Sequence, residues 1–213
     1  MIVDERMAAF INSFAAPLPE YLNKLEVYSI ETNVPIIRKE MQSLMSFLLA
    51  MNRPSNVLEV GTAIGFSALF MKENLPGGSK ITTIEKYEKR IPIARENFSL
   101  YDPDKAITLI EGDATEVLKS LEGTYDFIFM DAAKGQYINF LPDILRLMPK
   151  GGILLSDNVM QDGDILESRY AVTRRNRTIY SRMRDYLFEL THNAELKTVI
   201  LPVGDGVTVS VKE

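Results

Sequence analysis

The chain has 213 residues, which is enough for one domain with a full-sized core and too short for two comfortable ones. It contains no cysteine, which excludes disulfides, thiolate zinc sites and cysteine nucleophiles. A net charge of -5 argues against a generally basic surface of the kind that binds nucleic acid, but it is compatible with a local basic patch.

The N-terminal region is predicted to be helical. Residues 1–22 carry acids early and no long apolar run, so we expect neither a secretory signal nor a membrane span, and a cytoplasmic protein. Amphipathic patterns predict helices over residues 4–14 and 18–32, and a third that follows Pro35 and ends at Pro54. An apolar stripe on the second helix either covers the sheet or packs a homodimer; it consists of Leu18, Tyr21, Leu22 and Leu25.

From residue 56 the pattern alternates between strands and helices. Alternation at this spacing predicts a parallel sheet with helices on both faces. The strands are predicted at Asn56–Val60, Lys80–Ile84, Ala106–Ile110, Tyr125–Met130 and Ile153–Ser156, and the helices between them at Ser67–Glu73, Arg90–Leu100, Thr115–Leu121 and Tyr137–Leu147.

The C-terminal tail breaks this alternation. Residues 195–201 and 207–211 are apolar runs on either side of the turn PVGDG, which predicts an antiparallel hairpin. The expected fold is therefore α/β: a seven-stranded, mostly parallel sheet closed by this hairpin. We expect a single domain over residues 1–213, with N-terminal helices at 1–53 and the sheet-containing core at 54–213.

The loops after the first three strands carry residues suited to a nucleoside. Gly61 and Gly65 let the backbone approach a ligand closely, and their spacing differs from the dinucleotide fingerprint G-x-G-x-x-G. Glu85 is placed to accept hydrogen bonds from ribose hydroxyls, and Asp113 to take the exocyclic amine of adenine. Each feature alone also fits a tight turn or a helix cap, but three in succession favour a bound nucleoside.

The next two strand ends supply oxygen ligands. Asp131 follows the fourth strand, and Asp157 and Asn158 follow the fifth, so two carboxylates and one amide meet at one crevice. Such ligands suit Mg²⁺, and Lys134 is a candidate general base beside them. The alternative is an Asp131–Lys134 ion pair at a helix start, with Asp157 and Asn158 in a turn.

Several segments together resemble the class I cation-dependent O-methyltransferases of the catechol and caffeoyl-coenzyme A type. They are LEVGTAIGFSAL, TTIEK, EGDA, DFIFMDAAKGQY, LLSDNV and LPVGDGVTV, in family order over nearly the whole chain. The resemblance implies a Rossmann-like methyltransferase fold, with S-adenosylmethionine and a divalent cation such as Mg²⁺ as cofactors. It implies that the methyl donor is surrounded by Val34, Glu59, Gly61, Ser67, Glu85, Asp113, Ala114 and Asp131.

The same resemblance implies a mechanism. Asp131, Asp157 and Asn158 would hold the metal, which binds two neighbouring acceptor oxygens and favours deprotonation of one. Asp131 and Lys134 would be the catalytic residues, with Lys134 taking the proton before the oxyanion attacks the methyl group in line. A protein of another class, a non-catalytic cofactor- or RNA-binding module, would have no reason to combine these four side chains.

An arginine-rich segment at residues 169–184 bears on the acceptor. It holds six arginines and no acid, and Arg174, Arg175 and Arg177 are candidate RNA contacts, with Tyr170 and Tyr180 as candidates for base stacking. The segment RRNRTI together with DAAKGQY resembles the bacterial tRNA 5-hydroxyuridine methyltransferases, so tRNA is the favoured acceptor. Its 5-hydroxyl beside O4 would give the metal the same two-oxygen grip as a catechol.

Other interpretations of this segment stay open. The arginines also fit a small acidic acceptor such as a coenzyme A thioester, and a simple catechol needs none of them. Alternatively, they belong to a solvated helix face, with Arg182 and Arg184 paired to acids such as Asp185 and Glu189.

Overall fold

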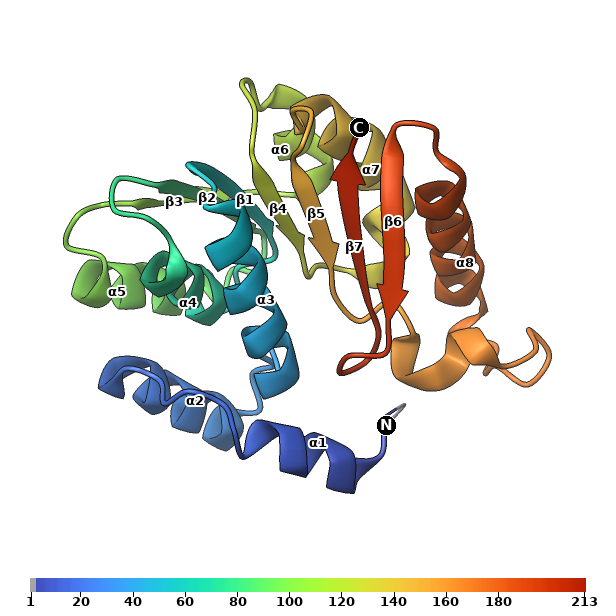
Figure 1. Cartoon of the computed structure of the whole chain (residues 1–213), viewed down its shortest axis with the longest axis horizontal. Coiled ribbons are helices and arrows are strands. Elements are labelled where there is room, and N and C mark those ends of the chain that lie inside the picture. Colours follow the sequence, from blue (N-terminus) through green and yellow to red (C-terminus); the bar gives the residue numbers. More distant parts are fainter. Residues whose placement is uncertain (1–2) are drawn as a thin grey trace.

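The structure is a computed structural model that describes residues 3–213 (Figure 1). Met1 and Ile2, part of the predicted segment 1–53, lie outside the described residues. Three helices precede the sheet: α1 (Glu5–Asn12), α2 (Glu20–Thr32) and α3 (Lys39–Asn52). All three confirm predicted helices, and α1 and α2 are somewhat shorter than their patterns indicated. Within the described range, no helix has both the length and the apolar character needed to cross a bilayer.

Seven strands form one sheet in the order β3-β2-β1-β4-β5-β7-β6. Strands β1 to β5 pair in parallel, whereas β7 is antiparallel to both β5 and β6. The predicted mostly parallel sheet with a terminal hairpin is therefore confirmed. The strands are β1 (Asn56–Val60), β2 (Lys80–Glu85), β3 (Ile107–Glu111), β4 (Phe127–Met130), β5 (Ile153–Ser156), β6 (Leu196–Leu201) and β7 (Val207–Lys212).

Helices cover both faces of the sheet and enclose two hydrophobic cores. Side chains alternate between the faces along each strand, so Phe127 and Phe129 of β4 join one core while Ile128 and Met130 join the other. The first core also takes residues of α2, α3, α4 (Phe66–Asn74) and α5 (Ile91–Tyr101). The second takes residues of α6 (Ala114–Ser120), α7 (Tyr137–Leu147) and α8 (Arg177–His192).

The apolar stripe of α2 packs inside the chain. Leu22 and Leu25 are buried in the first core, and Leu18 and Tyr21 are partly buried against it. Of the two predicted roles, the stripe therefore covers this protein's own core and is not free to pack a second copy.

The strand order reverses between β1 and β4, which are neighbours although two strands separate them in sequence. Open parallel sheets bind ligands at such a point, beyond the carboxyl ends of the strands. The strand ends are fastened there by the backbone, because Asp131 N donates to Val60 O and Gly61 N donates to Ile84 O. Figure 1 shows α1 and α2 at the end of the molecule toward which β4 and β5 point.

Gly61 is required where β1 approaches β4. Its φ is +107°, and a Cβ at this position would overlap the backbone carbonyl of Asp131. Gly78 shares the positive φ, at +91°, but a Cβ added there would meet no atom within 4 Å. A substitution at Gly78 would therefore introduce backbone strain alone, whereas one at Gly61 would introduce both strain and steric overlap.

We expect Gly61→Ala to destabilise the fold by roughly 2 kcal/mol or more, because strain and overlap add. Gly78→Ala should cost only about 1 kcal/mol, from strain alone. Urea denaturation of the two variants beside the wild type measures the difference. Equal losses of stability would contradict the close approach of β1 to β4.

Candidate functional site

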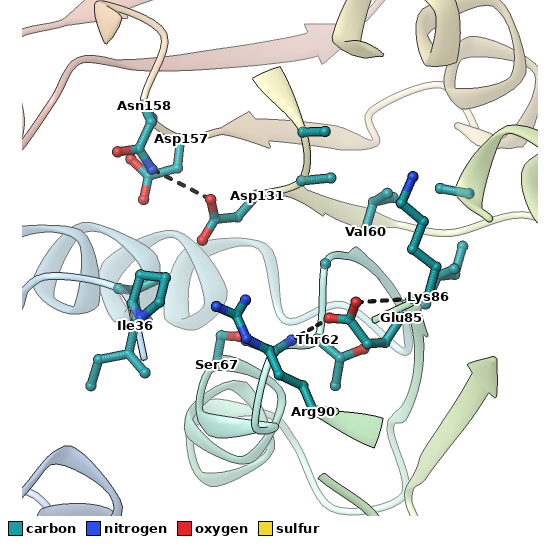
Figure 2. Close-up of a pocket in the computed structure, with 18 of the residues that line it drawn as sticks. Ile36, Val60, Thr62, Ser67, Glu85, Lys86, Arg90, Asp131, Asp157 and Asn158 are labelled. Carbon is teal, nitrogen blue, oxygen red and sulfur yellow. Dashed lines mark hydrogen bonds between the residues drawn. The ribbon is translucent and has the colours of Figure 1, made fainter. Parts of the chain in front are cut away.

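A cavity of about 430 Å³ opens at the carboxyl ends of β1 to β5. The loops after these strands, the segment before α3 and the turn of the β6–β7 hairpin form its walls. Figure 2 shows Asp131, Asp157 and Asn158 together on one side, and Glu85 with Lys86 on another. The volume suits a small-molecule ligand, and the two ends of the cavity differ in chemistry.

Glu85 and Asp113 lie at the cofactor end, as predicted, and both line the cavity. Glu85 accepts hydrogen bonds from the backbone N–H groups of Ala63, Lys86 and Tyr87, which fixes its carboxylate. Spare lone pairs on its two oxygens remain for ligand hydroxyls.

Asp113 caps α6 and also faces the cavity. Its carboxylate accepts from Thr115 N at 2.9 Å and pairs with Lys86 Nζ at 3.0 Å. Hydrogen bonds from Thr115 and the nearby Lys86 lower the pKa of Asp113 to about 2. Capping and ligand binding were alternatives in the sequence, and the geometry is compatible with both at once.

The other residues predicted around the methyl donor divide into two groups. Gly61, Ser67 and Ala114 line the cavity, whereas Val34 and Glu59 do not. Val34 is partly buried against the first core, and the segment that follows it, residues 35–38, forms the cavity wall.

Glu59 is fully buried below the cavity. Its Oε2 accepts a hydrogen bond from Thr83 Oγ1 at 2.5 Å, and Thr83 in turn contacts Thr62, a cavity residue. The other carboxylate oxygen, Oε1, is buried without a partner among the described residues. Burial raises the pKa of Glu59 to about 7, although hydroxyls of Ser67 and Thr83 act in the opposite direction.

The three predicted metal ligands meet at the chemical end. Asn158 Nδ2 lies 3.4 Å from Asp131 Oδ1, and Asp157 is 7% exposed. Burial raises the pKa of Asp131. It raises that of Asp157 to about 7, with a contribution from the adjacent charge of Asp131. A partly buried carboxylate (Asp131) and a buried one (Asp157) repel each other when they are close, and a bound cation relieves that repulsion.

The donor set fits a hard divalent cation. Across residues 3–213, no group of three His, Cys, Asp or Glu side chains is arranged to hold a metal. The candidate site thus has two acids, and a third protein ligand would come from the amide of Asn158. A flip of that amide would present its oxygen in place of the N–H that now faces Asp131. Mg²⁺ usually keeps several water or substrate oxygens, and a site with only three protein ligands leaves coordination positions free for them.

Lys134 begins the short 3₁₀ helix η1 (Lys134–Gln136) beyond β4. Its Nζ pairs with Asp205 Oδ2 at 3.3 Å, and the side chain is 29% exposed. The alternative of an ion pair with Asp131 is therefore wrong, since the partner comes from the hairpin turn. Lys134 is nevertheless close enough for its charge to act on both Asp131 and Asp157.

Known proteins resemble this chain over most of its length. A sequence model of a family described as O-methyltransferase matches residues 12–213. The chain belongs to this O-methyltransferase family. The O-methyltransferase is 32% identical to caffeoyl-CoA O-methyltransferase 5 of Nicotiana tabacum, over 78% of this chain and 72% of that protein. It is 31% identical to the O-methyltransferase ankF of Aspergillus thermomutatus, over 76% of this chain and 73% of that protein.

A solved structure also shows similarity to a methyltransferase. The SAH-bound methyltransferase PaMTH1 of Podospora anserina matches with a TM-score of 0.87 and 28% identity, over 98% of this chain and 94% of that one. The predicted fold, family and S-adenosylmethionine-dependent methyl transfer are thereby confirmed. The metal, the acceptor and the individual site residues stay predictions.

The arginine-rich segment of the O-methyltransferase comprises the loop before α8 and the first half of that helix, and the loop lies at the end of the molecule that holds the cavity (Figure 1). It does not line the cavity. Arg182 donates to Gly135 O and Arg184 to Ile165 O, so the alternative in which they pair with acids such as Asp185 and Glu189 is wrong. Charged donors on backbone carbonyls fasten the segment.

Three candidate RNA contacts in this segment differ in their surroundings. Arg174 and Arg175 are exposed, whereas Arg177 donates to the backbone carbonyls of Val172 and Tyr170. Tyr170 is 88% exposed and is free to stack on a base.

The prediction that Tyr180 stacks on a base is wrong. Its side chain is buried in the second core, and its hydroxyl donates to Glu167 O.

Arg90 and Asp205 are among the cavity residues that the sequence analysis did not identify. Arg90 points into the cavity (Figure 2), and no hydrogen bond or ion pair to its guanidinium occurs within residues 3–213. It stands at the start of α5, where the helix dipole disfavours a cation. That mismatch was the available signal. Asp205 belongs to LPVGDGVTV, which was interpreted as a hairpin turn and as a family segment, with no role given to its carboxylate.

Glu59 should make stability depend on pH. Between pH about 4.5 and about 7 the folded protein keeps the Glu59 proton that the unfolded chain releases. This carboxyl therefore lowers the free energy of unfolding by about 1 kcal/mol per pH unit as pH rises through that window.

We expect Glu59→Gln to lack this decline, so its stability relative to the wild type should rise with pH and level off above about 7. Urea denaturation of the ligand-free protein from pH 4.5 to 8 measures it. The exposed Glu122→Gln removes a surface carboxyl and should track the wild type. Parallel curves for all three proteins would show that burial does not perturb Glu59.

Proposed function

We propose that the protein methylates an acceptor that carries two adjacent oxygens, using S-adenosylmethionine and a divalent cation, and that 5-hydroxyuridine in the tRNA anticodon loop is the favoured acceptor. One observation carries the proposal: Asp131, Asp157 and Asn158 converge at one end of a cavity whose other end holds Glu85 and Asp113. A nucleoside bound at the end with Glu85 and Asp113 would place its methyl donor beside the candidate metal ligands.

The cofactor end suits each part of S-adenosylmethionine. Glu85 would accept hydrogen bonds from the ribose hydroxyls, and Asp113 from the adenine amine. The guanidinium of Arg90 would bind the methionine carboxylate. Gly61 leaves the backbone bare beside the ligand, and the acids around the cavity favour a cationic sulfonium.

At the chemical end, Asp131, Asp157 and Asn158 would hold the cation. When bound, a divalent cation supplies positive charge that favours loss of a proton from the acceptor hydroxyl. In its neutral form Lys134 would accept that proton, and its partial exposure leaves it accessible to an acceptor. The walls hold acceptor and methyl donor at attack distance, which is where most of the acceleration originates.

Two features favour RNA as the acceptor. Arg174, Arg175 and Tyr170 are exposed at the end of the molecule that holds the site, where they could contact phosphates and stack on a base. An anticodon loop is single-stranded, so its base can enter a pocket. The names of the relatives support the second candidate, a small catechol-like or acyl-coenzyme A acceptor.

The test compares a simple catechol, an acyl-coenzyme A thioester of caffeic acid and tRNA bearing 5-hydroxyuridine, each with S-adenosylmethionine and Mg²⁺. We expect mass spectrometry to show methylation of the tRNA that EDTA abolishes and Mg²⁺ restores. Asp131→Ala should lower turnover by about a hundredfold or more. Small-molecule turnover alone would overturn the RNA proposal, and EDTA-resistant turnover would overturn the metal. A binding module would show tRNA affinity without methylation.

The exposed arginines are tested with a charge-matched pair. Arg174→Ala/Arg175→Ala should raise the KM for tRNA about tenfold, because two phosphate contacts are lost, and leave KM for S-adenosylmethionine unchanged. Lys150→Ala/Lys197→Ala removes two exposed charges near the amino ends of β5 and β6 and should change neither constant. Equal effects of both pairs of substitutions would contradict a specific RNA-binding role for the arginine-rich segment and favour a solvated surface.

A homodimer is also part of the proposal. Helix α1 and the residues just after it leave four large apolar side chains exposed: Met7, Phe10, Ile11 and Phe14. Such a cluster suits burial against a second copy. Light scattering after size-exclusion chromatography should give twice the monomer mass, and Phe10→Asp/Phe14→Asp should give the monomer. A monomeric wild type would contradict the dimer.

A further inference from the structure

Asp205 is a buried carboxylate at the chemical end that the mechanism above does not use. It is 4% exposed and lies in the turn between β6 and β7, where it lines the cavity. Its two oxygens have different partners. Oδ2 accepts from Lys134 Nζ at 3.3 Å, and Oδ1 accepts from the backbone N–H of Asp162 at 2.7 Å.

The second contact anchors the segment that follows β5. Asn158, Gln161 and Asp162 all have positive φ, at 57°, 51° and 53°, which costs free energy in residues that are not glycine. Such a conformation persists only where the surroundings hold it. This segment begins with the candidate metal ligands, so its conformation decides where Asn158 lies.

The backbone of the hairpin turn also holds the segment after β5 in place. Met160 N donates to Asp205 O at 2.9 Å, and Val159 N donates to Gly206 O at 3.0 Å. Gly206 has a φ of +78°, and a Cβ there would overlap the side chain of Met160. The turn thus packs closely against the segment after β5, and the Asp205 side chain also contacts Lys134.

We propose that Asp205 is a positioning residue for methyl transfer: one carboxylate oxygen holds Lys134 toward the acceptor, and the other holds the metal-ligand segment. The inference rests on the proposed function, in which Lys134 is the base. A lysine side chain has many rotamers, and one fixed partner confines its Nζ to a small volume. General-base catalysis requires such confinement, because the proton must be within hydrogen-bond reach.

The two contacts separate by substitution. Asp205→Asn keeps an oxygen for Asp162 N–H but removes the charge that holds Lys134, whereas Asp205→Ala removes both contacts. Asp205→Glu keeps the charge and should restore part of the activity. Asp102→Asn is a matched control: Asp102 is 5% exposed, pairs with Lys72 at 3.1 Å and accepts from Ala106 N and Ile107 N, remote from the cavity.

The experiment measures kcat and KM with the acceptor that the methylation assay identifies, and the Kd for S-adenosylhomocysteine by calorimetry. We expect Asp205→Asn to lower kcat about tenfold or more with Kd unchanged, and Asp205→Ala to lower it further. Asp102→Asn should reduce the melting temperature yet keep kcat. In a Lys134→Met background, Asp205→Asn should cause no further loss, because its route of action is gone.

Two readouts hold even if no acceptor is found and the proposed function fails. Melting temperatures of Asp205→Asn, Lys134→Met and the double variant should be non-additive. Hydrogen exchange at residues 159–163 should accelerate in Asp205→Ala but not in Asp205→Asn. Wild-type kcat in Asp205→Asn, equal loss in Asp102→Asn, or independent effects in the Lys134→Met background would each overturn the inference.

Discussion

The contact between the Gly61 backbone and the carbonyl of Asp131 is the constraint on which the site depends. Strands β1 and β4 can place their carboxyl ends side by side only because no side chain intervenes at Gly61. The order reversal of the sheet brings the glycine loop after β1 next to Asp131, the candidate metal ligand after β4. In the proposed function, the topology of the sheet itself would thus bring methyl donor and acceptor together.

Charge is the second organising feature. Glu85, Asp113, Asp131, Asp157 and Asp205 all line one cavity, with Lys86, Arg90 and Arg38 as cations on its walls. Burial raises the pKa of Asp131 and of Asp157, and the charge of Asp131 adds to the shift at Asp157, so both sites disfavour additional negative charge. Both proposed cofactors bring positive charge, one as a sulfonium and one as a metal ion. The cavity is thus electrostatically complementary to its ligands taken together.

Much of the fold and site was predictable because strand ends are local signals. The run YDFIFM followed by Asp131 indicates a buried strand and a polar end, and parallel pairing then brings the polar ends together. Partners that depend on long-range packing were not predictable. The ion pair between Lys134 and Asp205 joins residues 71 positions apart, and Arg182 bonds a carbonyl 47 positions away. Periodicity does not encode such distances, so the alternative of a solvated helix face named only nearby acids as partners for Arg182 and Arg184, and it was wrong.

The hairpin turn has a consequence for the order of folding. Asp205 follows Asp162 by 43 positions, yet it holds the segment that carries the candidate metal ligands. Domains generally fold as units, and β6 and β7 come last in the chain at residues 196–212. The segment after β5 therefore gains its anchor only once almost the whole chain has been synthesised.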